Sequence, residues 1–213
     1  PPPPPRRRGR GGARGAGPRA PPGPAAVFPG GGKSGGAHRH WRAIADATGD
    51  LDAVISGLQD IVEAELAFLD ANWPEELPAH VIHADLFPDN VLMLGETVTG
   101  LIDFYFAASD FRAYDLAVTH ASWTFSDDGS HCDPVRARAL MRGYAREIAL
   151  NEAEIAALPL LARGAALRFL LTRAHDWVHT PADALVTRKN PAPFLARLRR
   201  YRADDAASLF AAA

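Results

Sequence analysis

The residues best suited to chemistry are two carboxylates and an amide near the middle of the chain. The stretch "HADLFPDN" (83–90) places His83, Asp85 and Asn90 at the spacing H-x-D-x-x-x-x-N, and Asp103 follows thirteen residues after Asn90. A carboxylate such as Asp85 can accept the proton of an attacking hydroxyl. Amide and carboxylate oxygens, as in Asn90 and Asp103, are ligands that Mg²⁺ prefers. A base beside two Mg²⁺ ligands is the set that phosphoryl transfer to a hydroxyl requires.

Each of these residues, taken alone, has an ordinary structural interpretation. Asp89 and Asn90 are frequent turn residues, and Asp85 precedes a Phe-Pro pair that also favours a turn. Asp103 could close a strand end, and His83 could hydrogen-bond the loop rather than carry a proton. The chemical interpretation therefore depends on a fold that brings the group together.

A predicted β-hairpin between the two metal-ligand candidates would do so. Residues 91–94 and 98–102 are short β-type runs on either side of a Gly-Glu turn. Because a hairpin places its two ends side by side, Asn90 and Asp103 can meet although thirteen positions separate them. The spacing favours a metal site at the base of the hairpin.

The rest of the chain from Trp41 onward is predicted to be mostly helical. Apolar residues recur at helical spacing, Asp133 is a candidate cap, and Pro159 predicts a kink or junction. The expected helices span residues 50–73, 112–124, 133–148, 152–178 and 191–210. The predicted fold class is therefore mainly α with a small β hairpin (α+β).

Charge divides the chain into two parts. Residues 1–40 hold eight Lys and Arg and no acidic residue, whereas residues 41–213 hold 15 Lys and Arg against 25 Asp and Glu. The acidic body argues against a nucleic-acid function for the folded part. No apolar run approaches the roughly 18–20 residues that cross a bilayer, and the single Cys132 fits a reducing compartment. We expect a soluble, cytoplasmic protein with no membrane partner; its oligomeric state stays open.

Residues 1–40 form a Pro-, Gly- and Arg-rich segment that we expect to be disordered. It holds too few apolar side chains to offset the entropy of ordering. Its arginines could contact RNA or another polyanion, or the segment could be an appendage or the product of a shifted frame or wrong start. "PGGGKSGG" (29–36) is similar to a phosphate-binding loop, but the Gly that this pattern requires at position 27 is Val27.

The spacing of the central motif resembles the catalytic and metal-binding loops of the aminoglycoside phosphotransferase and choline kinase group, within the protein-kinase-like fold. Longer strings are similar, more narrowly, to the bacterial homoserine kinases of this group. They are "VIHADLFPDNVLML", "GLIDFYFAASDFRAYDLAVTHASWTF", "LPLLARGAALRFLLTRAHDW" and "ALVTRKNPAPFLARLR". The resemblance covers roughly residues 41–202, about three quarters of the chain.

This resemblance implies ATP-dependent phosphorylation of the L-homoserine hydroxyl, a step on the route to threonine, with ATP and Mg²⁺ as cofactors. Carried over by position, Asp85 is the catalytic base, and Asn90 and Asp103 are the Mg²⁺ ligands that contact ATP. An aminoglycoside, choline or a sugar stays open as the substrate, because the same three residues would serve each. A non-catalytic remnant with a polyanion-binding basic tail is a further alternative.

Four other polar residues are weaker candidates. Tyr105 could face an amino-acid substrate or simply pack, and Asp115 could brace its helix against the catalytic loop. Arg168 and Arg173, five apart on an apolar helix, could bind a substrate carboxylate or serve as structural arginines. The sequence leaves these alternatives open.

Kinases of this fold also carry an N-terminal lobe with a Gly-rich cover and a strand lysine paired with a helix glutamate. Lys33 is the only lysine before Lys189 and lies among glycines, while Glu63 and Glu65 fall on the 50–73 helix. We therefore expect residues 41–213 to be a C-terminal lobe without its N-terminal partner. We also expect the chain alone to be weakly active or inactive.

Overall fold

The computed structural model describes residues 40–181 and 187–211, which form a mainly helical body with two short antiparallel strand pairs. This confirms the fold class predicted from the sequence. Residues 1–39 lie outside the described residues, and with them almost all of the segment expected to be disordered.

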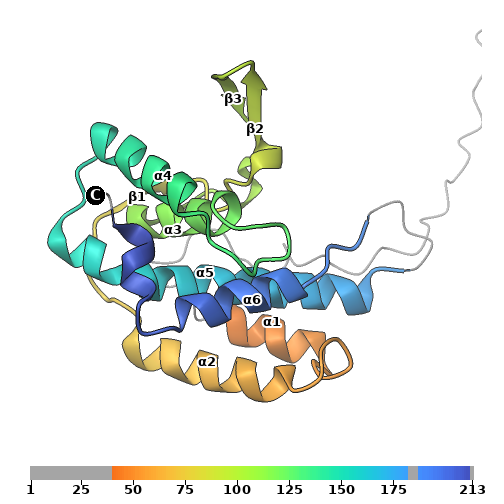
Figure 1. The fold of residues 1–213 in the computed structure, drawn as a ribbon. Helices are drawn as coiled ribbons and strands as arrows, with labels where there is room; N and C mark the ends of the chain where they lie inside the picture. Colours follow the sequence, from red (N-terminus) through yellow and green to blue (C-terminus); the bar gives the residue numbers. More distant parts are fainter. Residues whose placement is uncertain (1–39, 182–186, 212–213) are drawn as a thin grey trace, which may run out of the picture.

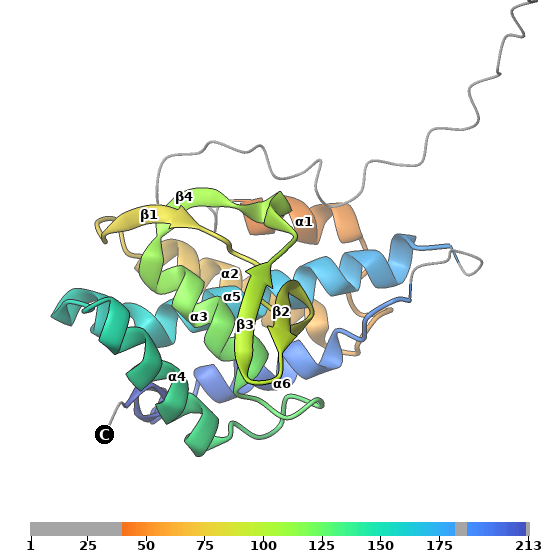
Figure 2. The ribbon, with the colours of Figure 1, turned by 90° about the horizontal axis from the view of Figure 1, so that it is seen from above.

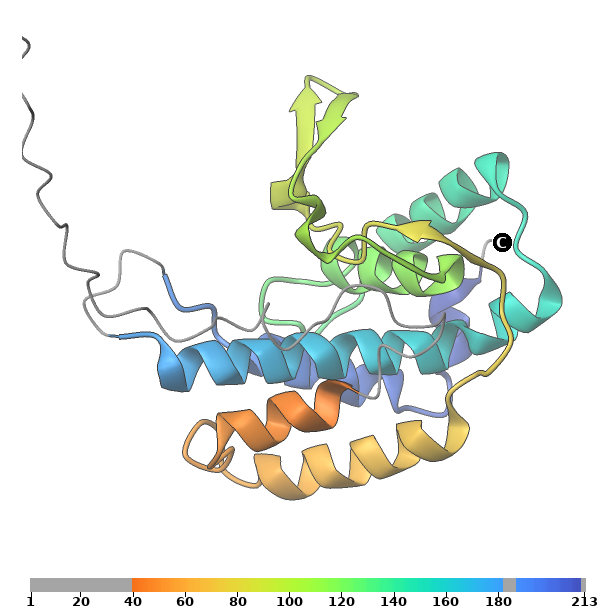
Figure 3. The same ribbon diagram turned by 180° about the vertical axis from the view of Figure 1, so that it is seen from behind.

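The longest helix, α5 (Glu152–His179), runs through the centre of the molecule. It contacts α1 (Trp41–Thr48), α2 (Leu58–Asn72), α3 (Arg112–Trp123) and α6 (Ala192–Tyr201). Figures 1 and 3 show α1 and α2 on one side of α5 and the strands on the other. Since α5 is covered on several sides, its leucines and alanines form the middle of one hydrophobic core.

Two features of the sequence decide where α5 begins and how it continues. The Asn151 side chain accepts the Glu154 N–H, and the Glu154 carboxylate accepts the Asn151 N–H, which is a capping box. The helix then continues through Pro159, so the helix junction predicted as one possibility at that residue is absent. By length and composition α5 could also cross a membrane, yet 61% of its most apolar window is buried inside the protein. We read it as a core helix.

The boundaries of two other predicted helices need correction. The helix expected over 50–73 begins only at Leu58, because Asp50 accepts the N–H groups of Asp52 and Ala53 and so closes a turn. Gly57, the residue just before the helix, has φ +74°, a conformation that favours glycine. The final helix ends at Tyr201 and is followed by the 3₁₀ helix η5 (Ala206–Phe210). Helix α1 was not predicted.

The helices expected over 112–124 and 133–148 are present as α3 and α4 (Pro134–Glu147). Asp133 caps α4 as predicted, since its side chain accepts the N–H groups of Val135 and Arg136. Such a cap satisfies donors that the first helical turn leaves free.

The strands hold the central motif between them. The predicted hairpin is formed by β2 (Val91–Leu94) and β3 (Thr97–Leu101) and stands out from the helices. A second pair joins β1 (Ala79–Ile82) to β4 (Ala108–Phe111) and lies against α3 (Figure 2). This second pair was not predicted. It ties both ends of the segment that carries the motif to the helical core.

Helix α1 and the end of α2 approach α5 at a glycine. A Cβ at Gly164 would lie 2.5 Å from atoms of both the Trp41 and the Trp73 ring, which is closer than packing allows. The two rings meet edge to face, with centroids 5.2 Å apart. Gly164 is therefore required by close approach rather than by backbone conformation.

Candidate active site

The loop that carries Asp85 is held by two helices at the residue before it. Ala84 has φ +60°, which is uncommon for a residue with a side chain. Its N–H and that of His83 both donate to the Asp115 carboxylate of α3, at 2.7 and 3.3 Å. The buried Arg168 of α5 donates to the Ala84 carbonyl. The core thus fixes both sides of this strained residue and with it the direction of Asp85.

The Asp85 carboxylate is half-buried and faces charges of both signs. Burial raises its pKa, the nearby Arg168 opposes that rise, and the Asp103 carboxylate adds to it. The Asn90 side-chain nitrogen donates to the Asp85 carbonyl at 2.7 Å and to its carboxylate at 3.2 Å. Asp85 is therefore oriented by its neighbours.

His83 joins the Asp85 loop to the strand that leads to Asp103. Its Nε2 lies 2.9 Å from the Ile102 carbonyl, which can only accept, so Nε2 carries the proton. Its Nδ1 then accepts the Asp85 N–H at 3.3 Å. With both ring nitrogens engaged on backbone groups, His83 is placed to hold the loop rather than to move a proton.

Asn90 and Asp103 lie together at the base of the hairpin. Asn90 ends the 3₁₀ helix η3 (Pro88–Asn90), and its carbonyl accepts the Ile102 N–H at 3.0 Å. Asp103 has φ +62° and precedes the 3₁₀ helix η4 (Phe104–Phe106). Two left-handed residues, Ala84 and Asp103, thus flank the site, and such strain is frequent at functional sites.

A cavity of about 260 Å³ opens beside these residues. Its lining joins the loop, the hairpin base and one face of α5: Asp85, Phe87, Asp89, Asn90, Asp103, Phe106, Arg168, Phe169, Thr172, Arg173, Asp176 and Lys189. All three residues of the proposed catalytic set therefore face one space.

The available donor atoms fit Mg²⁺. Because the Asn90 nitrogen donates to Asp85, its side-chain oxygen is left to accept or to ligate. The Asp103 carboxylate accepts no hydrogen bond from the described residues. No three His, Cys, Asp or Glu side chains gather into a metal-binding group in this part of the chain. That suits an ion which takes one or two protein oxygens and completes its shell with phosphates and water.

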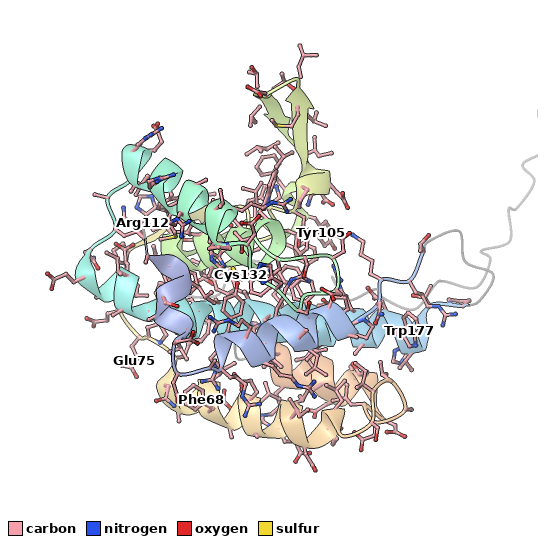
Figure 4. All side chains as sticks on the ribbon, viewed as in Figure 1. Phe68, Glu75, Tyr105, Arg112, Cys132 and Trp177 are labelled. Atoms are coloured by element: carbon pink, nitrogen blue, oxygen red, sulfur yellow. The ribbon has the colours of Figure 1, made fainter. Side chains whose placement is uncertain are left out.

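Two of the weaker candidates lie away from the cavity or are otherwise engaged. Tyr105 is 66% exposed, packs on Phe106 and does not line the cavity; Figure 4 shows it at the base of the hairpin. Arg168 lines the cavity but is only 4% exposed and is bound to the Ala84 carbonyl. It helps to position the loop.

Arg173 differs from Arg168 in its surroundings. It is half-buried, donates to the Asn190 carbonyl at 3.3 Å and lies over the Phe194 ring. The sequence reasoning missed Thr172, Asp176 and Lys189 as lining residues. The spacing of Phe169, Thr172, Arg173 and Asp176 on a helix was the available signal, because residues three and four apart share a face.

The cavity brings together a loop aspartate, an asparagine and a second aspartate, which are the residue types that phosphoryl transfer requires. The phosphotransferase enzyme family matches residues 24–150, more than half of the chain. The chain belongs to this family.

Several curated relatives named homoserine kinase share high identity with the chain. That of Xanthobacter autotrophicus is 54% identical over 168 residues, which are 78% of this chain and 52% of the relative. The Nitrobacter hamburgensis protein is 56% identical over 160 residues, or 75% and 49% of the two chains. The Zymomonas mobilis protein is 50% identical over 172 residues, or 80% and 53%. The chain spans about half the length of the relatives it matches.

Proposed function

We propose that this chain contributes the catalytic and metal-binding half of an ATP-dependent kinase that phosphorylates the hydroxyl of L-homoserine. The observation that carries this proposal is the meeting of Asp85, Asn90 and Asp103 at one cavity. The homoserine kinase name of the relatives supports the choice of substrate. The single free Cys132 and the buried α5 accord with a cytoplasmic enzyme.

Each residue has a distinct task in this proposal. Asp85 orients the substrate hydroxyl and accepts its proton. Asn90 holds Asp85 through its nitrogen and offers its oxygen to the metal, while Asp103 offers a charged oxygen from the opposite end of the hairpin. Bound Mg²⁺ would neutralise the negative charge of the triphosphate.

We further propose that residues 41–213 correspond to the C-terminal lobe of the kinase-like fold and that the 213-residue chain alone turns over slowly. Lys189 is the only lysine of the described residues, and it pairs with Asp89 at 3.6 Å. Glu65 is buried and paired with Arg163 of α5. The described residues thus lack the lysine–glutamate pair that holds the phosphates in such kinases, and positioning supplies most of this catalysis.

The test is ADP release with Mg²⁺-ATP and, in parallel, L-homoserine, choline, kanamycin or glucose. It is run on the chain alone and on a chimera that adds the unmatched half of the Xanthobacter homoserine kinase. We expect homoserine-dependent release by the chimera, little by the chain, and loss in both with Asp85→Asn.

Three outcomes would change the proposal. If ADP release depended on choline, kanamycin or glucose, that acceptor would be the substrate in place of homoserine. Rapid turnover by the chain alone would show that catalysis does not need the lysine–glutamate pair that the described residues lack. A well-folded chimera that is inactive with every acceptor would favour a non-catalytic role.

A further inference from the structure

One face of α5 forms a wall of the candidate cavity and carries charges that the proposed chemistry does not use. Phe169, Thr172, Arg173 and Asp176 line the cavity at helical spacing. The proposed function assigns no task to any of them.

Of the three cations that line the cavity, Arg173 is the one available to a ligand. Arg168 is buried against the Ala84 carbonyl, and Lys189 pairs with Asp89. Arg173 belongs to no ion pair of the described residues; its one hydrogen bond goes to the Asn190 carbonyl. Burial lowers its pKa to about 10, so it stays charged at neutral pH.

A second guanidinium reinforces the positive charge at this place. Arg197 of α6 is 7% exposed and lies, like Arg173, over the Phe194 ring. Repulsion by the Arg197 charge lowers the pKa of Arg173, and the Asp85 carboxylate opposes this effect. An anion bound at Arg173 would relieve this repulsion.

Of the carboxylates that line the cavity, Asp176 is the one without a task. Asp85 and Asp103 serve the proposed reaction, and the exposed Asp89 pairs with Lys189. Among the described residues no side chain forms a hydrogen bond or an ion pair with the Asp176 carboxylate. Burial raises the pKa of Asp176 more than the neighbouring His175 and His179 lower it, so a ligand cation beside the carboxylate would offset the cost of its burial.

We propose that Arg173 and Asp176 bind the α-carboxylate and the α-ammonium group of an amino acid whose side-chain hydroxyl points toward Asp85. This inference rests on the proposed function and adds the recognition of the substrate class. Residues three apart on a helix have Cβ atoms about 5–6 Å apart, which suits two charges attached to one carbon atom. Phe169 and Phe106 supply an apolar wall for the methylene groups between these charges and the hydroxyl.

The length of the substrate is limited by the same helix. Arg173 lies five residues from Arg168, which is about 7.5 Å along the helix axis. Arg168 in turn holds the residue before Asp85. A short amino acid therefore spans the distance between Arg173 and the Asp85 loop.

The inference is tested by ligand-observed NMR titration of the 213-residue chain, which needs no turnover. L-homoserine is compared with L-homoserinamide, which lacks the carboxylate, and with 4-hydroxybutyrate, which lacks the ammonium group. We expect L-homoserine to bind at least about tenfold more tightly than either analogue, because each charged hydrogen bond is worth that much or more.

Variants then assign each preference to a residue. Arg173→Met should abolish the preference for homoserine over the amide, and Arg173→Lys should restore part of it. Asp176→Asn should abolish the preference over 4-hydroxybutyrate only. Arg188→Met and Asp204→Asn, which change exposed residues outside the cavity, should leave both ratios unchanged. Thermal unfolding of each variant shows that it is folded.

The outcomes separate this inference from the proposed function. If no amino acid binds, or if the ratios survive Arg173→Met and Asp176→Asn, the inference is overturned even where homoserine is phosphorylated. If L-serine or L-threonine binds with the same dependence on both residues while the chimera fails to phosphorylate homoserine, the inference holds and the proposed substrate is wrong.

Discussion

The Asp115 carboxylate accepts a hydrogen bond of 2.7 Å from the backbone N–H of Ala84. Ala84 adopts a left-handed conformation that an alanine avoids, and Asp85 follows it directly. The contact joins α3 to the loop across 31 residues of sequence. The direction of the proposed base thus depends on a helix that contributes nothing to the cavity itself.

We expect Asp115→Ala to release this loop. The change leaves the N–H groups of His83 and Ala84 without their acceptor, and a lost bond of this kind costs about 1–3 kcal/mol. Hydrogen exchange of the Ala84 amide should become faster, and the free energy of unfolding in urea should fall. Asp204→Ala, at an exposed site, is the control. Unchanged exchange at Ala84 would show that Asp115 does not hold the loop.

We expect two glycine-to-alanine changes in helices to have opposite effects on the stability of the protein. At Gly164 the new methyl would meet the rings of Trp41 and Trp73, and overpacking of this kind costs about 1–3 kcal/mol. At Gly143 in α4 nothing lies within 4 Å, so alanine should stabilise the protein by about 0.4–1 kcal/mol. Urea midpoints measure both. Equal effects at the two sites would contradict the close approach of α1 and α2 to α5.

We expect the two ion pairs of α2 to differ strongly in their contribution to stability. Arg163→Met leaves the buried Glu65 with only the more distant Arg202, at 3.5 Å, and breaking a buried pair costs about 3–5 kcal/mol at most. Arg42→Met removes an exposed pair with Asp70, worth about 0–1 kcal/mol. The same urea titrations compare them. If Arg42→Met lowered the free energy of unfolding as much as Arg163→Met does, the buried pair would not be the stronger of the two.

We expect stability to fall at mildly acidic pH because of one buried histidine. His120 lies between the Tyr201 hydroxyl and the Leu209 carbonyl, and burial lowers its pKa to about 4. The unfolded chain, with a pKa near 6.5, takes up the proton first, so stability is present above about pH 6.5 and is lost as the pH falls toward 4. Between pH 7 and 4.5 this loss amounts to about 2–3 kcal/mol.

The pH profile of unfolding in urea checks this expectation against His120→Gln. Because other acidic groups titrate in the same range, the slopes of the two proteins are compared rather than their absolute stabilities. The variant should show a flatter profile between pH 4.5 and 7. Parallel profiles would mean that His120 is not kept neutral by the fold.

The local sequence was sufficient to predict some helices and strands but not others. The hairpin from Val91 to Leu101 and the helix capped by Asp133 depend on neighbouring residues, and both were predicted. The pairing of β1 with β4 was missed because its strands are separated by a long intervening segment and are only four residues each. Helix α1 is short, and its burial against α5 rather than its own propensity stabilises it.

The sequence by itself determined the chemical inventory of this protein: a base candidate, two metal-ligand candidates and a hairpin between them. These depend on residue type and on spacing over a few residues. A hairpin brings the residues at its two ends close together, so this spacing is enough to predict that they meet. Only the tertiary structure showed that Arg168 donates to the Ala84 carbonyl and that Arg173 and Asp176 line the cavity. The reason is physical: the same α5 helix faces the core and the cavity, and only packing against the Asp85 loop determines which of its charges is already engaged.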